Sequence, residues 1–311
     1  MALHTIEPDQ NTVHGLFSSE FAPVLEIDSG DTVRYRTLDS GWNLEQPGNS
    51  GEPPRRLAPR FEGLDKGHAL CGPVAIRGAE PGMTLEVRLD VLQPGAWGGT
   101  YATGWPSELN KALGVAEEPR TTLRWQLDTA RMIGTDQHGH TIQLRPFLGV
   151  IGMPPPEPGH HPTPPPRIWG GNIDCKELVA GSTLYLPISV PGALVSVGDG
   201  HGTQADGEVC GTAIECPMER AELTYTVRDD LRVQTPRANT PAGWITFGFD
   251  KDLNKATVAA LSAMLDLMGE LHGLPRREAL ALASLVVDMR ITQIVNGVSG
   301  VHAVLPHDAL R

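Results

Sequence analysis

Leu194-Val-Ser-Val-Gly-Asp-Gly-His-Gly-Thr-Gln-Ala-Asp-Gly-Glu208 begins as an apolar, strand-like run and continues as acidic and histidine residues separated by glycines. Asp199 and His201 are two residues apart, so in an extended strand both side chains leave the same face. The glycines around them allow tight turns or close approach of a ligand to the backbone. The segment therefore predicts a strand that leads into a functional site.

Similar strand-like runs, separated by turn residues, occupy most of the chain. The composition agrees, because 35 Gly, 27 Pro and only 5% aromatic residues in 311 positions are typical of a turn-rich β protein. Residues 21–37 predict a hairpin with its turn at 28–31, and 74–77 with 84–91 predict a second strand pair whose turn contains Pro81-Gly82. A further strand is expected at 209–216.

A helical period appears only near the C-terminus. It predicts helices at 256–271, where Gly273 stops the first one, and at 276–287, followed by closing strands at 291–295 and 301–305. Residues 41–67, 95–120 and the proline-rich 153–166 are expected to be loops. The pattern as a whole predicts a β-dominated body with a helix pair near its C-terminal end.

Charge and hydropathy exclude several classes of partner. The formal net charge of −12 argues against nucleic acid or an anionic membrane, whose recognition needs clustered Lys and Arg. Apolar runs fall short of the ~20 residues that span a bilayer, and the N-terminal MALHTIEPDQ has no signal-peptide pattern. The four cysteines show no disulfide or metal spacing. We therefore expect a cytoplasmic protein with reduced thiols.

Acidic residues accumulate around the quoted segment. Carboxylates beside an imidazole suit a hard or borderline cation, and they also suit general base catalysis. Asp174 follows Gly-Gly-Asn-Ile and could equally cap a helix or an Asx turn. Glu208 and Glu215 are seven residues apart and would leave opposite faces of one uninterrupted strand, so at most one is expected on the same metal unless Gly211 forms a bulge.

One further residue and one further motif are weaker candidates for a functional role. His68 is a lone histidine before a strand, and a surface loop position would account for it. Cys175-Lys-Glu177 contains the residue types of a Cys-Glu-Lys amidase, but consecutive side chains point apart and do not form a triad.

Several long motifs resemble the acetamidase/formamidase family over nearly the whole chain. These are Gly72-Pro-Val-Ala-Ile-Arg-Gly-Ala-Glu-Pro-Gly82, Trp169-Gly-Gly-Asn-Ile-Asp174, Gly181–Leu194, Gly198–Val209, and Asp288-Met-Arg-Ile-Thr-Gln-Ile-Val-Asn-Gly-Val298. The resemblance implies a β-sandwich body with a smaller α/β part. It also implies a metal-dependent amidohydrolase of short aliphatic amides that forms a homo-oligomer.

The family's site residues correspond here to Asp174, Asp199, His201 and Glu208, with His68 in a related motif. Two positions depart from the family pattern: Cys71 stands where Thr is usual, and Ala205 where Gly is usual. Either change could reshape the pocket, so the resemblance leaves open which amide is cleaved. We expect a β-sandwich over 1–245 that carries the metal site, and a helix pair with closing strands over 246–311.

These observations combine into one hypothesis. Asp174, Asp199 and His201, with Glu215 as a further ligand, hold a divalent ion, with Zn²⁺ expected and Ca²⁺ or Mn²⁺ as alternatives. Glu208 acts as general base, and Asp206 and His68 orient a ligand or the small amide substrate. The alternatives are a thiol amidase that uses Cys175, and a non-catalytic, metal-stabilised β-sandwich that binds a small ligand.

Overall fold

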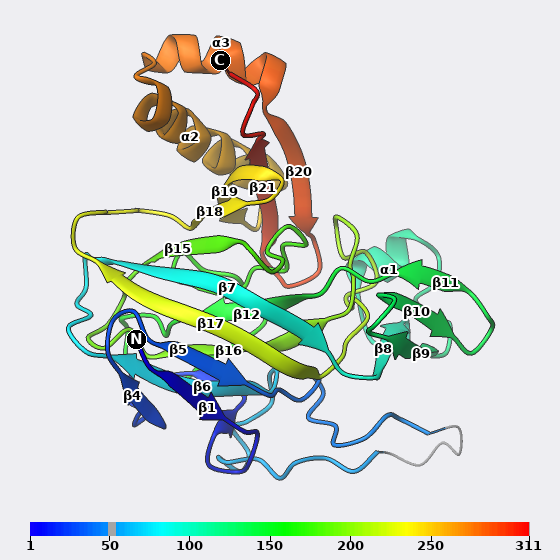
Figure 1. Ribbon diagram of the computed structural model, residues 1–311. Helices are drawn as coiled ribbons and strands as arrows, with labels where there is room; N and C mark the ends of the chain where they lie inside the picture. The colour runs from blue at the N-terminus through cyan, green and yellow to red at the C-terminus, as the bar shows by residue number, and fades with distance from the viewer. Residues whose placement is uncertain (49–53, 311) are drawn as a thin grey trace.

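The structure is a computed structural model that describes residues 1–48 and 54–310, and two large β-sheets form its body (Figure 1). The larger sheet has nine strands, in the order β1 (Leu3–Ile6), β5 (Thr32–Tyr35), β17 (Met218–Arg228), β7 (Thr84–Pro94), β15 (Thr183–Pro187), β18 (Arg237–Thr240), β19 (Gly243–Asp250), β21 (Ser299–Leu305) and β20 (Asp288–Gln293). The second sheet has six strands, β14 (Gly170–Asn172), β12 (Phe147–Gly152), β16 (Val195–His201), β6 (Leu70–Ile76) and β2 (Val13–His14), with β4 (Leu25–Ile27) paired to β6.

Smaller elements surround this body. A four-stranded sheet contains β11 (Thr141–Gln143), β10 (Ile133–Asp136), β9 (Thr121–Asp128) and β8 (Trp97–Ala102), and a two-stranded sheet contains β13 (His161–Pro162) and β3 (Leu16–Phe17). The helices are α1 (Glu108–Ala112), α2 (Leu253–His272) and α3 (Arg276–Val286). None of these described helices has the length and hydropathy needed to cross a membrane.

One apolar core joins the two large sheets. Alternate residues of β7, Leu85, Val87 and Leu89, are fully buried, and they belong to the same core as Ile76 of β6 and Val197 of β16. Side chains that alternate between core and solvent along a strand, with a second sheet opposite, define a β-sandwich. The predicted mainly β fold with a sandwich body is confirmed.

Both predicted hairpins are wrong in their pairing, although their turns are present. The turn at 28–31 forms, but β4 pairs with β6 in one sheet while β5 pairs with β1 and β17 in the other. Likewise Gly82 has the positive φ of +90° that the predicted turn requires, yet β6 and β7 lie in different sheets. Local turn chemistry does not reveal which sheet the next strand joins, so these turns connect the two layers of the sandwich.

The C-terminal helix pair is confirmed. Gly273 ends α2 in a left-handed conformation, as the sequence indicates. α2 lies on β19, where a Cβ at Gly248 would come within 2.1 Å of the Ala256 carbonyl oxygen, so glycine permits this close approach. Four expectations fail: α1 and β8 both lie within the predicted 95–120 loop, the short β13 lies within the predicted 153–166 loop, and 209–216 is not a strand.

The C-terminal strands continue the sheet of the body. The predicted boundary between residues 245 and 246 falls inside β19, which pairs with both β18 and β21. The helix pair and these strands nevertheless share a second apolar core around Met264, Leu267 and Met268. The division into two units stays a prediction.

His14 makes the stability of the sandwich sensitive to acid. Burial lowers its pKa from 6.5 to about 4, and its Nδ1 donates to the Leu16 carbonyl while Nε2 accepts from the Ser196 hydroxyl. Because the folded pKa lies below the unfolded value, the unfolded chain binds the extra proton, and stability falls as pH decreases from 6.5 to about 4. At about 1.4 kcal/mol per pKa unit, the loss is about 3 kcal/mol.

Urea unfolding at pH 7 and pH 4 checks this expectation. His14→Gln should lose about 3 kcal/mol less than the wild type over this range, whereas His138→Gln, at an exposed turn, should behave like the wild type. An unchanged pH dependence in His14→Gln would contradict the assignment.

Candidate active site

The predicted acidic residues and His201 converge in the interior. Asp199 and His201 end β16, Asp174 follows β14, and Glu208 and Glu215 come from the loop after β16. All five side chains are buried, and they form two groups that share His201: Asp174, His201 and Glu208, and Asp199, His201 and Glu215. Within each group one donor atom per residue lies within 4.8 Å of the others. Segments far apart in the sequence thus place four carboxylates around one imidazole.

A glycine on the neighbouring strand makes room for this convergence. A Cβ built on Gly149 of β12 would lie 2.5 Å from Asp199 Oδ2, 2.7 Å from Asp174 Oδ1 and 2.9 Å from His201 Cε1. These separations are too short for any side chain. The lack of a side chain at Gly149 therefore leaves the space in which the three side chains meet.

The donor atoms around His201 lack ordinary partners. His201 Nε2 lies 3.4 Å from Asp199 Oδ1 and 3.4 Å from Glu215 Oε1, with the ring held edge-on against Phe147 at a centroid distance of 4.9 Å. Among the described residues, neither nitrogen of His201 has a hydrogen-bond partner, and Asp174 Oδ1, Asp199 Oδ1 and Glu215 Oε2 share this property. Buried polar atoms are normally satisfied, so these atoms are candidate ligands for a cation.

The backbone is strained at three of the four acids. Asp174, Asp199 and Glu208 have φ values of 56°, 57° and 47°, a region that residues other than glycine seldom adopt. Such conformations persist where the surrounding structure enforces them, and they concentrate at functional sites. Here each one turns a carboxylate inward.

Burial and mutual repulsion perturb the protonation of the acids. Burial, and then the charges of Glu208 and Asp199, raise the pKa of Asp174 well above its usual value. Burial also raises the pKa of Glu208 to about 8 against the opposing effect of His201. Burial opposes ionisation of Asp199 too, but His201 and His68 hold its pKa below the usual range. A cation bound here would favour the ionised form of each of these acids.

Carboxylates of the same site favour the protonated form of the His201 imidazole. Burial alone would lower the pKa of His201, but Glu215 and Asp199 raise it well above its usual value. The ring thus carries a proton that a cation would replace.

Asn296, in the turn between β20 and β21, is a site residue that the sequence analysis missed. Its Nδ2 donates to Asp174 Oδ2 at 2.7 Å and to Glu208 Oε2 at 3.5 Å. Gln204 supports the same corner by donating to the Asp174 carbonyl at 2.9 Å. Asn296 precedes a glycine, and Asn-Gly is an ordinary hairpin turn signal. The sequence pattern is therefore explained by the turn alone and does not indicate a role in the site.

Two expectations about individual residues change. Asp174 caps neither a helix nor an Asx turn, because one carboxylate oxygen accepts from Asn296 and the other faces the site. Glu208 and Glu215 both reach His201. The opposite-face argument fails because 209–216 turns at Gly211, whose amide bonds to the Glu208 carbonyl, instead of forming a strand.

Asp206 and His68 lie outside both groups. Lys176 Nζ holds Asp206 at 2.7 Å, and the Thr163 hydroxyl bonds to His68 Nδ1 at 2.8 Å. His68 is still near enough for its charge to lower the pKa of Asp199. These residues border the site without completing either donor group.

A pocket of about 300 Å³ leads to the acidic cluster. Of the two donor groups, Glu208 is the member that lines this pocket among the described residues. Much of the remaining wall is apolar, with Trp125, Ile142 and Ile214, and Asp206 adds a polar edge. The base candidate therefore stands between the pocket and the buried donors.

The family comparison covers almost the entire chain. A model described as the acetamidase/formamidase family matches residues 3–161 and 157–310. This chain belongs to the acetamidase/formamidase family. The assignment indicates an enzyme that hydrolyses amides.

Individual relatives agree with the assignment. A formamidase of Methylophilus methylotrophus is 26% identical over 257 residues, covering 65% of this chain and 61% of its own. The crystal structure of an acetamidase from Bacillus halodurans is 25% identical with a TM-score of 0.83, covering 97% of each chain. A second crystal structure, of a predicted acetamidase/formamidase from Thermoanaerobacter tengcongensis, is 23% identical with a TM-score of 0.84. It covers 98% of this chain and 96% of its own, and it supports the fold.

Gly149→Ala tests the convergence directly. The added methyl group would displace Asp174, Asp199 and His201, so we expect kcat/KM for amide hydrolysis to fall by about a hundredfold or more. Gly269→Ala in α2 is the matched control, because its Cβ would meet only the Leu274 carbonyl at 3.4 Å. Wild-type activity in Gly149→Ala would show that the site lies elsewhere.

Proposed function

We propose that the chain is a metal-dependent amidohydrolase that cleaves short aliphatic amides to a carboxylate and ammonia. The observation that carries the proposal is the group of buried, unpartnered donors around His201, described above. Two ligands about 2.1 Å from a tetrahedral Zn²⁺ lie about 3.4 Å apart. The separations of His201 Nε2 from Asp199 Oδ1 and Glu215 Oε1 are both 3.4 Å.

The donor set fits a divalent cation held by Asp199, His201 and Glu215, with Asp174 as a further ligand. One nitrogen with several carboxylate oxygens favours Zn²⁺, and Mn²⁺ or Ca²⁺ are the alternatives. When bound, such a cation supplies Lewis acidity toward the amide carbonyl and lowers the pKa of water from about 15.7 toward about 7. Asn296 keeps Asp174 oriented by donating to its other oxygen.

Glu208 is the general base in this proposal. Its carboxylate borders the pocket and contacts Asn296, so it can reach both the attacking water and the leaving nitrogen of a bound amide. A nearby cation favours its ionised form. Glu208 then takes a proton from water and returns it to the nitrogen, because ammonia leaves far more readily than an amide anion.

The neighbouring residues are assigned supporting roles. Asp206, beside Lys176 at the pocket edge, orients the substrate, and His68 stabilises the ionised form of Asp199. The pocket of about 300 Å³ suits a small amide.

We also propose a homo-oligomer and a cytoplasmic location. Exposed apolar side chains on α3 and β20, including Leu285, Met289 and Ile291, support self-association. The four cysteines, all in the described part of the chain, are free thiols, in keeping with a reducing compartment.

The two alternatives have less support. The Cys175 thiol is fully buried, and burial raises its pKa well above the usual value, which disfavours the nucleophilic thiolate. A closed oxygen cage around Ca²⁺ in a non-catalytic binding protein would not need the imidazole of His201.

Metal removal distinguishes the proposed metal-dependent amidohydrolase from the thiol amidase and from the non-catalytic binding protein. Chelator-treated protein should lose ammonia release from formamide, acetamide, propionamide and butyramide, and Zn²⁺ should restore it. The thiol amidase would instead remain active after chelation. Wild-type protein that binds metal yet releases no ammonia from any amide would favour the binding protein.

Glu208→Gln tests the base. The amide side chain retains the shape and the contact to Asn296 but cannot take a proton, so we expect kcat to fall by about a hundredfold to ten-thousandfold with metal content unchanged. Glu219→Gln, a half-exposed surface change, serves as the control. Full turnover by Glu208→Gln would remove Glu208 from the chemistry.

A further inference from the structure

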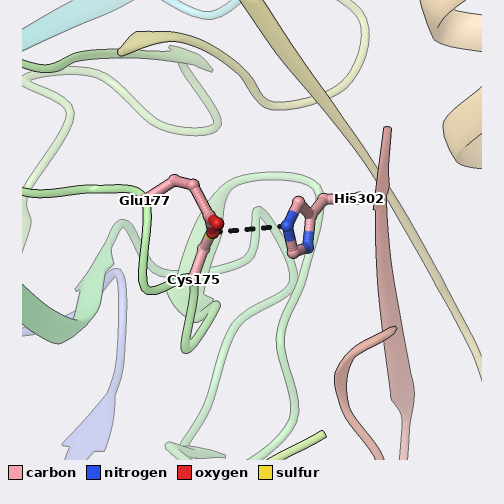
Figure 2. A group of neighbouring side chains, drawn as sticks. All are labelled: Cys175, Glu177 and His302. Carbon is pink, nitrogen blue, oxygen red and sulfur yellow. Dashed lines mark hydrogen bonds and ion pairs between the residues drawn. The ribbon is translucent and has the colours of Figure 1, made fainter. Parts of the chain in front are cut away.

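A second cluster of metal-type donors lies outside the proposed catalytic groups. Cys175 and Glu177, from the segment after β14, meet His302 of β21, and Figure 2 shows the three side chains pointing toward one another. Their exposed fractions are 0%, 1% and 0%. Neither proposed catalytic group includes any of the three.

The separations within this cluster match those of ligands around one ion. Glu177 Oε2 lies 3.4 Å from Cys175 Sγ and 3.3 Å from His302 Nε2. All three donor atoms lie within 4.8 Å of one another. Ligand atoms about 2.0–2.3 Å from a tetrahedral Zn²⁺ are about 3.3–3.7 Å apart.

Outer partners orient two of the three ligands, His302 and Glu177, toward the centre. Thr292 Oγ1 lies 2.8 Å from His302 Nδ1, and Arg290 donates to Glu177 Oε1 at 2.8 Å. This arrangement holds the far side of the imidazole and of the carboxylate, as in metal sites whose ligands are fixed by a surrounding layer of hydrogen bonds.

His302 Nε2 is the donor atom of this cluster that the described residues leave unpartnered. Among the described residues it has no hydrogen-bond partner, and it faces a carboxylate oxygen at 3.3 Å. If Nδ1 donates to Thr292, the Nε2 lone pair faces Glu177 directly, and the two acceptors repel each other unless a cation lies between them. A proton on Nε2 is the alternative, with the Thr292 hydroxyl then donating to Nδ1.

We propose that Cys175, Glu177 and His302 form a second, structural metal site for a thiophilic divalent cation such as Zn²⁺. The thiol releases its proton to solvent on binding, and a solvent oxygen completes a tetrahedral set with the three protein ligands. The bound ion links the segment that carries Asp174 to β21, in addition to the Glu177–Arg290 ion pair. The inference does not depend on the proposed hydrolytic role.

Cobalt substitution distinguishes the two sites. Full-length protein, stripped of metal and reloaded with Co²⁺, should show the near-ultraviolet thiolate-to-cobalt charge-transfer band, which the carboxylate and imidazole donors around His201 cannot produce. Cys175→Ser should abolish the band and reduce the cobalt content by one ion per chain. Cys71→Ser, at another buried free thiol, should retain both.

Further variants keep the test decisive if Cys175→Ser does not fold. His302→Gln should remove the same cobalt ion, and Thr292→Val should weaken its binding by about 10- to 100-fold. Cobalt-loaded wild-type protein that shows the band but hydrolyses no amide would count against the proposed function alone. Folded wild-type protein that shows no band with Co²⁺, or a band that persists in Cys175→Ser, would overturn the second site in favour of a proton on His302.

Discussion

A buried imidazole surrounded by buried carboxylates needs positive charge beyond its own. Around His201, burial and then repulsion between the acids raise the pKa of Asp174 and Glu208, while the protonated ring compensates only part of the charge. In the proposed function, a divalent cation binds one nitrogen of His201 together with the unpartnered carboxylate oxygens. The backbone is strained at Asp174, Asp199 and Glu208, which adopt left-handed conformations, and the surrounding structure enforces this strain.

The sandwich provides the rigid frame for this charge cluster. β12 contributes a glycine where any side chain would fill the centre, and β16 presents Asp199 and His201 side by side. The C-terminal hairpin closes the site from the other direction. Asn296 of its turn bonds to Asp174, and Gly207 pairs with its backbone at Thr292 and Ile294. The candidate site thus depends on strands that the sequence alone would assign to a separate unit.

The sequence predicted several residues of the candidate site better than it predicted the strand pairing around them. Asp199 and His201 were placed correctly because two-residue spacing along a strand is a local property. The predicted pairings of β4 with β5 and of β6 with β7 were wrong because turn residues do not specify which sheet receives the next strand. Gly149 could have been noticed as a glycine inside an apolar strand, a sign of close approach. The contact of Asn296 spans 122 positions and leaves no local signal.

Anomalous diffraction at the zinc edge, from crystals of active Zn²⁺-loaded protein, tests the central claim most directly. The account predicts a strong peak about 2 Å from His201 Nε2, between the carboxylates of Asp199 and Glu215. Density that leaves His201 without a cation in active crystals, or an ion bound only at surface residues, would contradict it.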